Sequence, residues 1–109
     1  MTEREIQTAI LREIGALPGV LVERSNTGSA VDARGRRIQF GTPGAPDIRV
    51  TAAGRSLAIE VKSPTGRQSP EQQRWQQAFE AAGGVYVLAR DVDAAVDAVR
   101  DALDTGRAA

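Results

Sequence analysis

The stretch from Leu57 to Val61 constrains the fold most, because it is apolar on both sides of a strand and still contains a charge. Residues 56–62 read Ser-Leu-Ala-Ile-Glu-Val-Lys. An apolar run of this kind is typical of a central strand that is buried on both faces of a sheet. A charged side chain in such a strand is costly unless it has a partner. We therefore predict that Glu60 and Lys62 belong to a site.

A second strand precedes this one in the chain. The sequence predicts strands over 47–51 and 56–62, joined by a turn over 52–55, so that the two form an antiparallel hairpin. Such a hairpin places Asp47 and Glu60 on neighbouring strands, within reach of one ion. The two-residue period of a strand puts Glu60 and Lys62 on one face and Val61 on the other. The alternative is a solvent-exposed hairpin that carries an ordinary surface Glu–Lys pair.

The residue types of this hairpin are those of a metal-dependent hydrolase. Lys62 is the only lysine among fourteen basic residues, and an ammonium is a compact point charge that the broad guanidinium of arginine does not replace. The chain has no His and no Cys, so any metal must be held by oxygen, which favours Mg²⁺ or Mn²⁺ over zinc. Two carboxylates beside an ammonium suit the hydrolysis of a phosphodiester, with Lys62 orienting or deprotonating a water.

The charges are unevenly distributed, although the fourteen basic and fourteen acidic residues cancel. Residues 24–74 contain nine basic and four acidic residues, whereas both flanking segments are net acidic. The positive charge thus lies in the same segment as the candidate site, as a phosphate-binding face requires. We expect Arg34, Arg36, Arg37 and Arg67 to contact phosphate groups; a solvated surface position is the alternative for each.

The remaining pattern predicts a single α/β domain over residues 1–105, with a central mixed β-sheet flanked by helices in the order α-β-β-β-α-β-α. We expect helices over 2–16, 69–82 and 91–103, and strands over 20–22 and 85–89, the last of them buried. Residues 25–36 are predicted to be a mobile loop, 37–40 a short extended piece, and 106–109 a disordered tail. No segment has the apolar length of a membrane span or a signal peptide, so we expect a cytoplasmic protein.

Two polar side chains outside the hairpin are further candidates. At about 100° per residue, Glu3 falls on the same helix face as Ile10 and Ile14, which turns it towards the core and the site. The alternative is an N-terminal glutamate that favours the helix dipole. Gln72 completes a capping box with the predicted N-cap Ser69, and it serves the site only if this helix start abuts it. Trp75 and Phe79 are predicted to be core residues and not a base-stacking platform.

Several motifs, taken in order, resemble the VRR-NUC domains of the PD-(D/E)xK nuclease superfamily, in particular the stand-alone members carried by phages and bacteria. They are Glu3 with Gln7, Arg24-Ser25-Asn26-Thr27-Gly28, Gly44-Ala45-Pro46-Asp47, Ile59-Glu60-Val61-Lys62 and Gly66-Arg67-Gln68-Ser69-Pro70-Glu71-Gln72.

The resemblance implies a restriction-endonuclease-like fold and roles for individual residues. Asp47, Glu60 and the Val61 carbonyl would hold Mg²⁺ or Mn²⁺, with Glu3 as the acidic residue of the first helix, acting directly or indirectly. Lys62 would be the catalytic lysine and Gln72 the active-site glutamine. Asn26, in the second motif, is a further candidate DNA contact. Compact members are similar to Holliday-junction resolvases, which act as dimers on branched DNA.

We therefore predict a metal-dependent DNA endonuclease that is selective for branched DNA or Holliday junctions and acts as a homodimer in a bacterial or phage-infected cell. One alternative is a restriction-like nuclease with sequence preference. Another is a DNA-binding module of the same fold without catalysis, which the pair of uncompensated carboxylates disfavours, since they would repel phosphate. A structural interaction protein would explain the fold but not the charges of the site.

Overall fold

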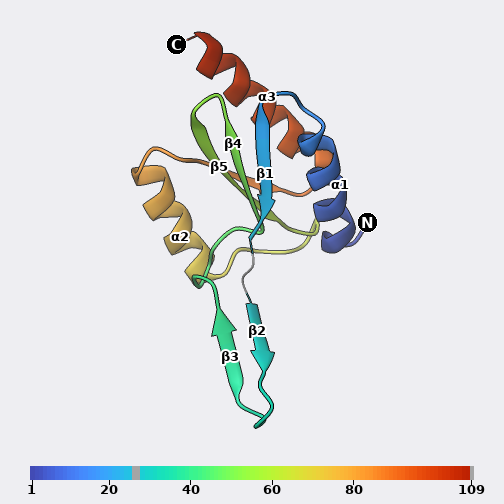
Figure 1. Ribbon diagram of the computed structural model, residues 1–109, viewed down its shortest axis with the longest axis vertical. Helices are drawn as coiled ribbons and strands as arrows, with labels where there is room; N and C mark the ends of the chain where they lie inside the picture. The colour runs from blue at the N-terminus through green and yellow to red at the C-terminus, as the bar shows by residue number, and fades with distance from the viewer. Residues whose placement is uncertain (26–27, 109) are drawn as a thin grey trace.

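A mixed four-stranded sheet forms the centre of the molecule, in the strand order β1-β4-β5-β6. The computed structural model describes residues 1–25 and 28–108. In it, β1 pairs antiparallel with β4, β4 antiparallel with β5, and β5 parallel with β6 (Figure 1). The strand bounds are β1 Val20–Arg24, β4 Ile48–Ala52, β5 Arg55–Val61 and β6 Val85–Ala89. This arrangement confirms the predicted mixed α/β fold and its central strand.

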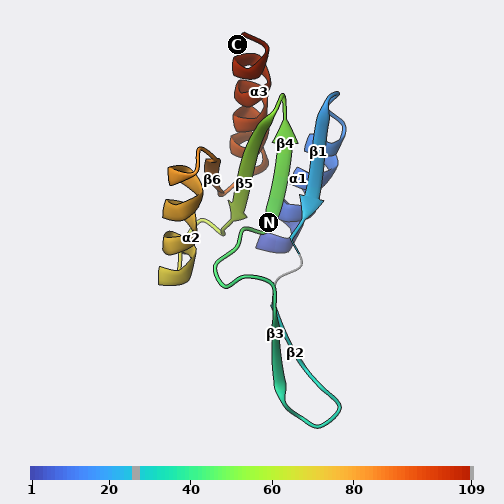
Figure 2. The same cartoon turned by 60° about the vertical axis from the view of Figure 1, so that its left-hand side comes forward.

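The helices cover the two faces of this sheet. Helices α1 (Glu3–Gly15) and α3 (Val92–Ala108) pack on one face, where they form the core with the inward residues of β4 and β5, and α2 (Pro70–Ala81) lies on the other (Figure 2). The core cluster consists of aliphatic side chains: Ile6, Ile10, Ile14, Ile48, Val50, Ala52, Leu57, Ile59, Val61, Ala89, Ala95, Val99, Ala102 and Leu103. Among the residues that the structure describes, no helix is long and apolar enough to cross a membrane.

The β4–β5 hairpin has the register that the candidate site requires. Ile48 pairs with Ile59 and Val50 with Leu57, and these side chains alternate inwards with a period of two. Asp47 immediately precedes β4, and Glu60 is the next residue after Ile59. The register therefore brings Asp47 and Glu60 together at one end of the hairpin, while Val61 points into the α1/α3 core.

The prediction of a loop over residues 25–36 was wrong for part of this segment. Gly28–Val31 form β2, which pairs antiparallel with β3 (Arg37–Phe40) in a separate two-stranded sheet. This hairpin projects away from the four-stranded sheet (Figures 1 and 2). Its turn is held by Asp32, whose carboxylate accepts hydrogen bonds from the backbone N–H groups of Arg34 and Arg36. Gly, Ser and Ala have low strand propensity, so the composition of β2 concealed the pairing.

Three further details differ from the sequence-based expectations. Strand β6 is a sheet edge and is half-buried over most of its length, not fully buried. Trp75 and Phe79 are half-buried on α2 and lie outside the core cluster. Helix α3 continues beyond Leu103 through residues 106–108, for which we expected a disordered tail. Gly106 packs so closely against Ala53 that a Cβ would not fit, and this contact offsets the low helix propensity of glycine.

Candidate active site

The carboxylate of Asp47 is fixed by backbone groups of its neighbours. Its Oδ2 accepts a hydrogen bond of 2.8 Å from the N–H of Val61, at the end of β5. Its own carbonyl accepts one of 2.8 Å from the N–H of Ser25, which follows β1. The preceding Pro46 is fully buried. Asp47 therefore lies where β1 and β5 end and β4 begins, in a position that the backbone determines.

Glu60 is the most unusual residue of the protein, because its carboxylate is buried and only partly bonded. The residue is 2% exposed. Its Oε1 accepts a hydrogen bond of 3.0 Å from Gln72 Nε2 and lies 3.9 Å from Lys62 Nζ. Its Oε2 is buried and has no hydrogen-bond partner within the described residues. A buried acceptor without a partner costs about 1–3 kcal/mol, and more when it is charged, so this oxygen is suited to receive a ligand.

The surroundings of Glu60 disfavour its ionised form. Burial raises the pKa of its carboxyl from 4.5 to about 8, and the negative charge of Asp47 adds to this shift. The ammonium of Lys62 lowers the pKa but does not outweigh these causes, and Glu3 contributes a further small increase. A divalent cation between Asp47 and Glu60 would reverse this balance, because it favours both carboxylates in their charged form.

Gln72 completes the capping box and also contacts Glu60. Its Oε1 accepts a hydrogen bond from the backbone N–H of Ser69, and the Ser69 hydroxyl accepts one from the N–H of Gln72, which completes the capping box of α2. Its Nε2 donates to Glu60 at the same time. The start of α2 therefore abuts the end of β5, and the cap orients the amide that holds the buried carboxylate.

Glu3 lies at the rim of the same region. Its Oε1 accepts a hydrogen bond of 3.0 Å from the N–H of Ser63, just after β5. A cavity of about 410 Å³ lies here, lined by Glu3, Arg4, Gln7, Arg24, Asp47 and Val61. The structure thus brings Glu3 to the end of β5, as the helix geometry predicted, whereas Glu5 faces solvent and closes the capping box of Thr2. Sequence reasoning did not assign Arg4 or Arg24 to the site.

The donor set of this site fits a cation that needs few protein ligands. Within the described residues, no group of three or more His, Cys, Asp and Glu side chains could by itself hold a metal ion. Asp47 and Glu60 offer carboxylate oxygens, one of which is buried without a partner. Mg²⁺ is usually bound through one or two carboxylates, with waters and substrate phosphates completing its shell. The residues present therefore fit Mg²⁺ or Mn²⁺.

The candidate DNA-contacting residues lie apart from the carboxylates. Arg34, Arg36 and Arg37 are exposed on the projecting β2–β3 hairpin, where Arg36 forms an ion pair of 3.2 Å with Asp32. Arg67 is exposed in the segment before α2. None of the four lines the cavity beside Asp47. The fifth candidate, Asn26, lies outside the described residues.

Arg90 positions the loop that follows the site, and no sequence pattern indicated this role. Its Nη1 donates hydrogen bonds to the carbonyls of Ser63, at 2.6 Å, and Gly66, at 2.8 Å. Gly66 in turn lies against Lys62 and Glu3, since a Cβ on Gly66 would be 3.4 Å from Lys62 Cδ and 3.3 Å from Glu3 Oε1. Arg90, at the end of β6, therefore holds the loop over Lys62.

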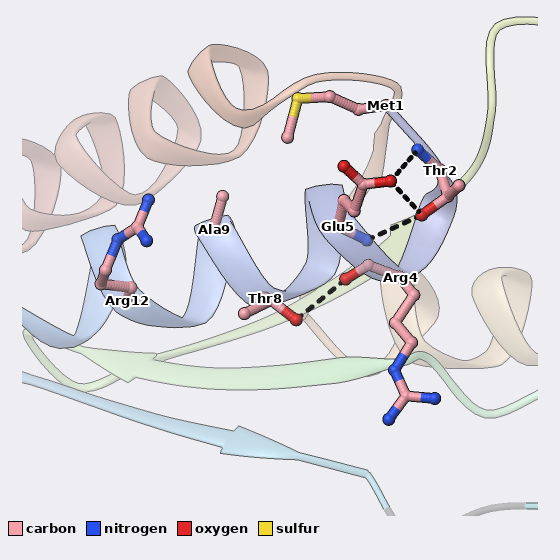
Figure 3. A pocket seen from close by; sticks show the side chains of 7 residues that line it. All are labelled: Met1, Thr2, Arg4, Glu5, Thr8, Ala9 and Arg12. Atoms are coloured by element: carbon pink, nitrogen blue, oxygen red, sulfur yellow. Dashed lines mark hydrogen bonds between the residues drawn. The ribbon is translucent and has the colours of Figure 1, made fainter.

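Another hollow, of about 420 Å³, lies along α1. It is lined by Met1, Thr2, Arg4, Glu5, Thr8, Ala9 and Arg12. Figure 3 shows Glu5 turned back towards Thr2, to which it is hydrogen bonded, while Arg12 stands two turns further along the helix. None of Asp47, Glu60, Lys62 and Gln72 lines this hollow, although Arg4 lines both it and the cavity beside Asp47.

The comparisons with known proteins agree with this geometry. The sequence matches the VRR-NUC domain family over residues 3–93. A solved structure described as "VRR_NUC domain" is similar to this chain, with a TM-score of 0.64 and 22% sequence identity, over 92% of this chain and 97% of that chain. None of the curated proteins matches the chain.

Proposed function

The chain belongs to the VRR-NUC domain family, which makes it a nuclease of the PD-(D/E)xK type, and from this premise we propose its reaction and substrate. We propose that it is a Mg²⁺- or Mn²⁺-dependent DNA endonuclease, that it prefers branched DNA such as Holliday junctions, and that it acts as a homodimer.

The observation that carries this proposal is the buried carboxylate of Glu60. Its Oε2 has no hydrogen-bond partner within the described residues, and Asp47 raises its pKa instead of stabilising its charge. With both carboxylates ionised, such an arrangement is unfavourable in a domain without a ligand. A divalent cation held by the two carboxylates would make it favourable. A surface Glu–Lys pair would need no such ligand, and Glu60 is not at the surface.

The residues that would hold the cation are Asp47 and Glu60, with the carbonyl of Val61 as a further oxygen and Glu3 acting directly or indirectly. A bound Mg²⁺ or Mn²⁺ would polarise the scissile phosphate and stabilise the charge that develops on it. Gln72 keeps Glu60 in place through its amide N–H. The N–H of Val61 does the same for Asp47.

Lys62 is proposed to position and activate the attacking water. Its ammonium lies 3.9 Å from Glu60 Oε1 and its side chain is 15% exposed, so that it reaches the site from β5 with little freedom. Arg90 and the loop over Lys62 restrict it further. An ammonium at this point also offsets negative charge on the phosphate.

DNA contacts are proposed for Asn26, Arg34, Arg36, Arg37 and Arg67. Four of them are arginines, which bind phosphate through a fork of donors. The projecting β2–β3 hairpin that carries three of them extends the positive surface beyond the carboxylates. In a homodimer, two sites of this kind could place paired nicks across a junction.

The test of this proposal is a cleavage panel. End-labelled four-way junction, linear duplex and single strand are incubated with the protein and Mg²⁺, Mn²⁺ or EDTA. We expect cleavage of the junction with either metal and much weaker cleavage of the linear forms. Lys62→Ala should abolish cleavage while retaining DNA binding, and Lys62→Arg should not restore it, since guanidinium has a different shape. Equal cleavage of all three substrates would refute the branched-DNA preference.

The homodimer is tested separately. Sedimentation equilibrium of the protein alone and with junction DNA measures the mass of the assembly directly. A mass of two chains per junction supports the proposal, and a single chain bound to a junction that it cleaves on both strands contradicts it.

A further inference from the structure

A second cavity shares one lining residue with the cavity beside Asp47. It has a volume of about 340 Å³ and is lined by Glu23, Arg24, Ser25, Gly41, Thr42, Ala45 and Arg49. Arg24 lines this cavity and also the one that contains Asp47 and Glu3. Both cavities therefore border the end of β1.

The lining of this second cavity is suited to an anion. Two of its lining residues, Arg24 and Arg49, are basic, and one, Glu23, is acidic. Glu23 and Arg49 face each other across β1 and β4, yet neither arginine forms an ion pair within the described part of the chain. Both guanidinium groups therefore have free donors.

Two observations indicate that this cavity can bind a ligand. The hydroxyl of Ser25 is buried and has no hydrogen-bond partner among residues 1–25 and 28–108. A buried hydroxyl of this kind costs about 1–3 kcal/mol unless a ligand satisfies it. The guanidinium of Arg49 lies 5.6 Å from the centroid of the Trp75 ring, and Trp75 is itself stacked on Phe79 at 4.8 Å. The aromatic pair on α2 therefore holds Arg49 in place.

We infer that this second cavity binds the backbone phosphate next to the scissile one, through Arg49 and the Ser25 hydroxyl. The inference rests on the proposed function, because it takes the cavity beside Asp47 as the place of the scissile phosphate. Ser25 is tied to Asp47 by the hydrogen bond from its N–H to the Asp47 carbonyl. Binding of the neighbouring phosphate at Ser25 thus positions the DNA strand with respect to the catalytic carboxylates.

The experiment combines single methylphosphonate substitutions in the DNA with single substitutions in the protein. A methylphosphonate removes the charge of one phosphate, and the linkages on either side of the mapped cut are replaced one at a time. With the wild-type protein we expect one neighbouring linkage at which the replacement lowers kcat/KM by about tenfold to a hundredfold, the range of a charge-assisted hydrogen bond. With Arg49→Ala the same replacement should have less than about twofold further effect, since the contact is already gone.

Matched variants separate this role from a structural one. Ser25→Ala should show the same loss of sensitivity at the same linkage, and Arg49→Lys should restore part of it. Arg12→Ala, in the hollow along α1 (Figure 3), should leave the sensitivity unchanged. Thermal unfolding of each variant checks that it is folded. If the wild type has no sensitive neighbouring linkage, or if every variant keeps the full sensitivity, the inference is overturned.

A binding experiment distinguishes this inference from the proposed function. The affinity of the Lys62→Ala variant for the same set of modified DNAs is measured in EDTA, without cleavage or metal. We expect one linkage whose neutralisation weakens the binding of Lys62→Ala but not the binding of the double variant Lys62→Ala/Arg49→Ala. This result would support the phosphate site even if no cleavage is found with any metal. The same losses in both proteins would overturn it, whatever the outcome of the cleavage panel.

Discussion

Replacing Glu60 by glutamine is predicted to change the pH dependence of stability. In the folded protein without metal, the pKa of Glu60 is about 8, against 4.5 for an ordinary glutamate, because the carboxyl is buried beside Asp47. Between these two values the folded chain keeps a proton that the unfolded chain releases. The unfolded state then binds fewer protons, so stability falls as the pH rises from about 5 to about 8.

The size of this effect follows from the shift. Each pKa unit corresponds to about 1.4 kcal/mol, which gives a loss on the order of 3–5 kcal/mol for this residue. The free energy of unfolding of a domain is roughly 5–15 kcal/mol, so this loss is a large part of it. The chain has no His and no Cys, so few other groups titrate over this range. Glu60→Gln cannot release the proton, and its stability should be nearly constant from pH 5 to pH 9.

Urea denaturation followed by the fluorescence of Trp75, the single tryptophan, measures this difference. At pH 5 the two proteins should be similarly stable, and at pH 9 Glu60→Gln should be the more stable one in EDTA. Millimolar Mg²⁺ should restore the stability of the wild type at pH 9 but have little effect on the stability of Glu60→Gln. Glu13→Gln, an exposed control, should follow the wild type. A parallel pH dependence of wild type and Glu60→Gln would refute the reasoning.

Three further predictions concern the segments that hold the site together. Gly44 has a φ of +80°, and a Cβ there would collide with the backbone of Glu71. Gly44→Ala should therefore lose more than about 2 kcal/mol of unfolding free energy in urea. Gly35→Ala is the control for the backbone cost alone, because Gly35 has a similar φ and open space around it, and it should lose about 1 kcal/mol. Gln72→Ala removes both a helix cap and a hydrogen bond to the buried carboxylate. We expect a loss of about 1–3 kcal/mol of unfolding free energy in the same assay, and an unchanged urea midpoint would contradict this. Arg90→Ala should speed amide hydrogen exchange in the loop after β5 at least severalfold, and unchanged exchange there would show that the loop does not depend on its two hydrogen bonds.

The hairpin that carries the carboxylates was predictable from the sequence, because its signals are local. Alternation and turn residues fix the register of β4 and β5, and the register alone determines that Asp47 and Glu60 are neighbours. The capping box of α2 was predictable for the same reason, since Ser69 and Gln72 are three residues apart. Whether Gln72 also reaches Glu60 depends on how α2 packs on the sheet, which no local pattern contains.

The arginines around the site could not be placed from the sequence. Arg24, Arg49 and Arg90 belong to three different strands or their ends, and their long side chains reach groups that are distant in the chain. Arg90 is 27 residues from Ser63, whose carbonyl it binds. The β2–β3 hairpin was missed because Gly28, Ser29 and Ala30 lack the branched side chains that indicate a strand. In each case the determining contact is tertiary.

The central question is whether DNA cleavage requires a divalent cation held by Asp47 and Glu60. Single-turnover cleavage of a labelled four-way junction is measured with Mg²⁺, after addition of EDTA, and after excess Mg²⁺ is returned, for the wild type, Asp47→Asn and Glu60→Gln. We expect cleavage that stops in EDTA and resumes with Mg²⁺ in the wild type, and none in the two variants although they remain folded. Cleavage that persists in EDTA, or that either variant retains, would contradict it.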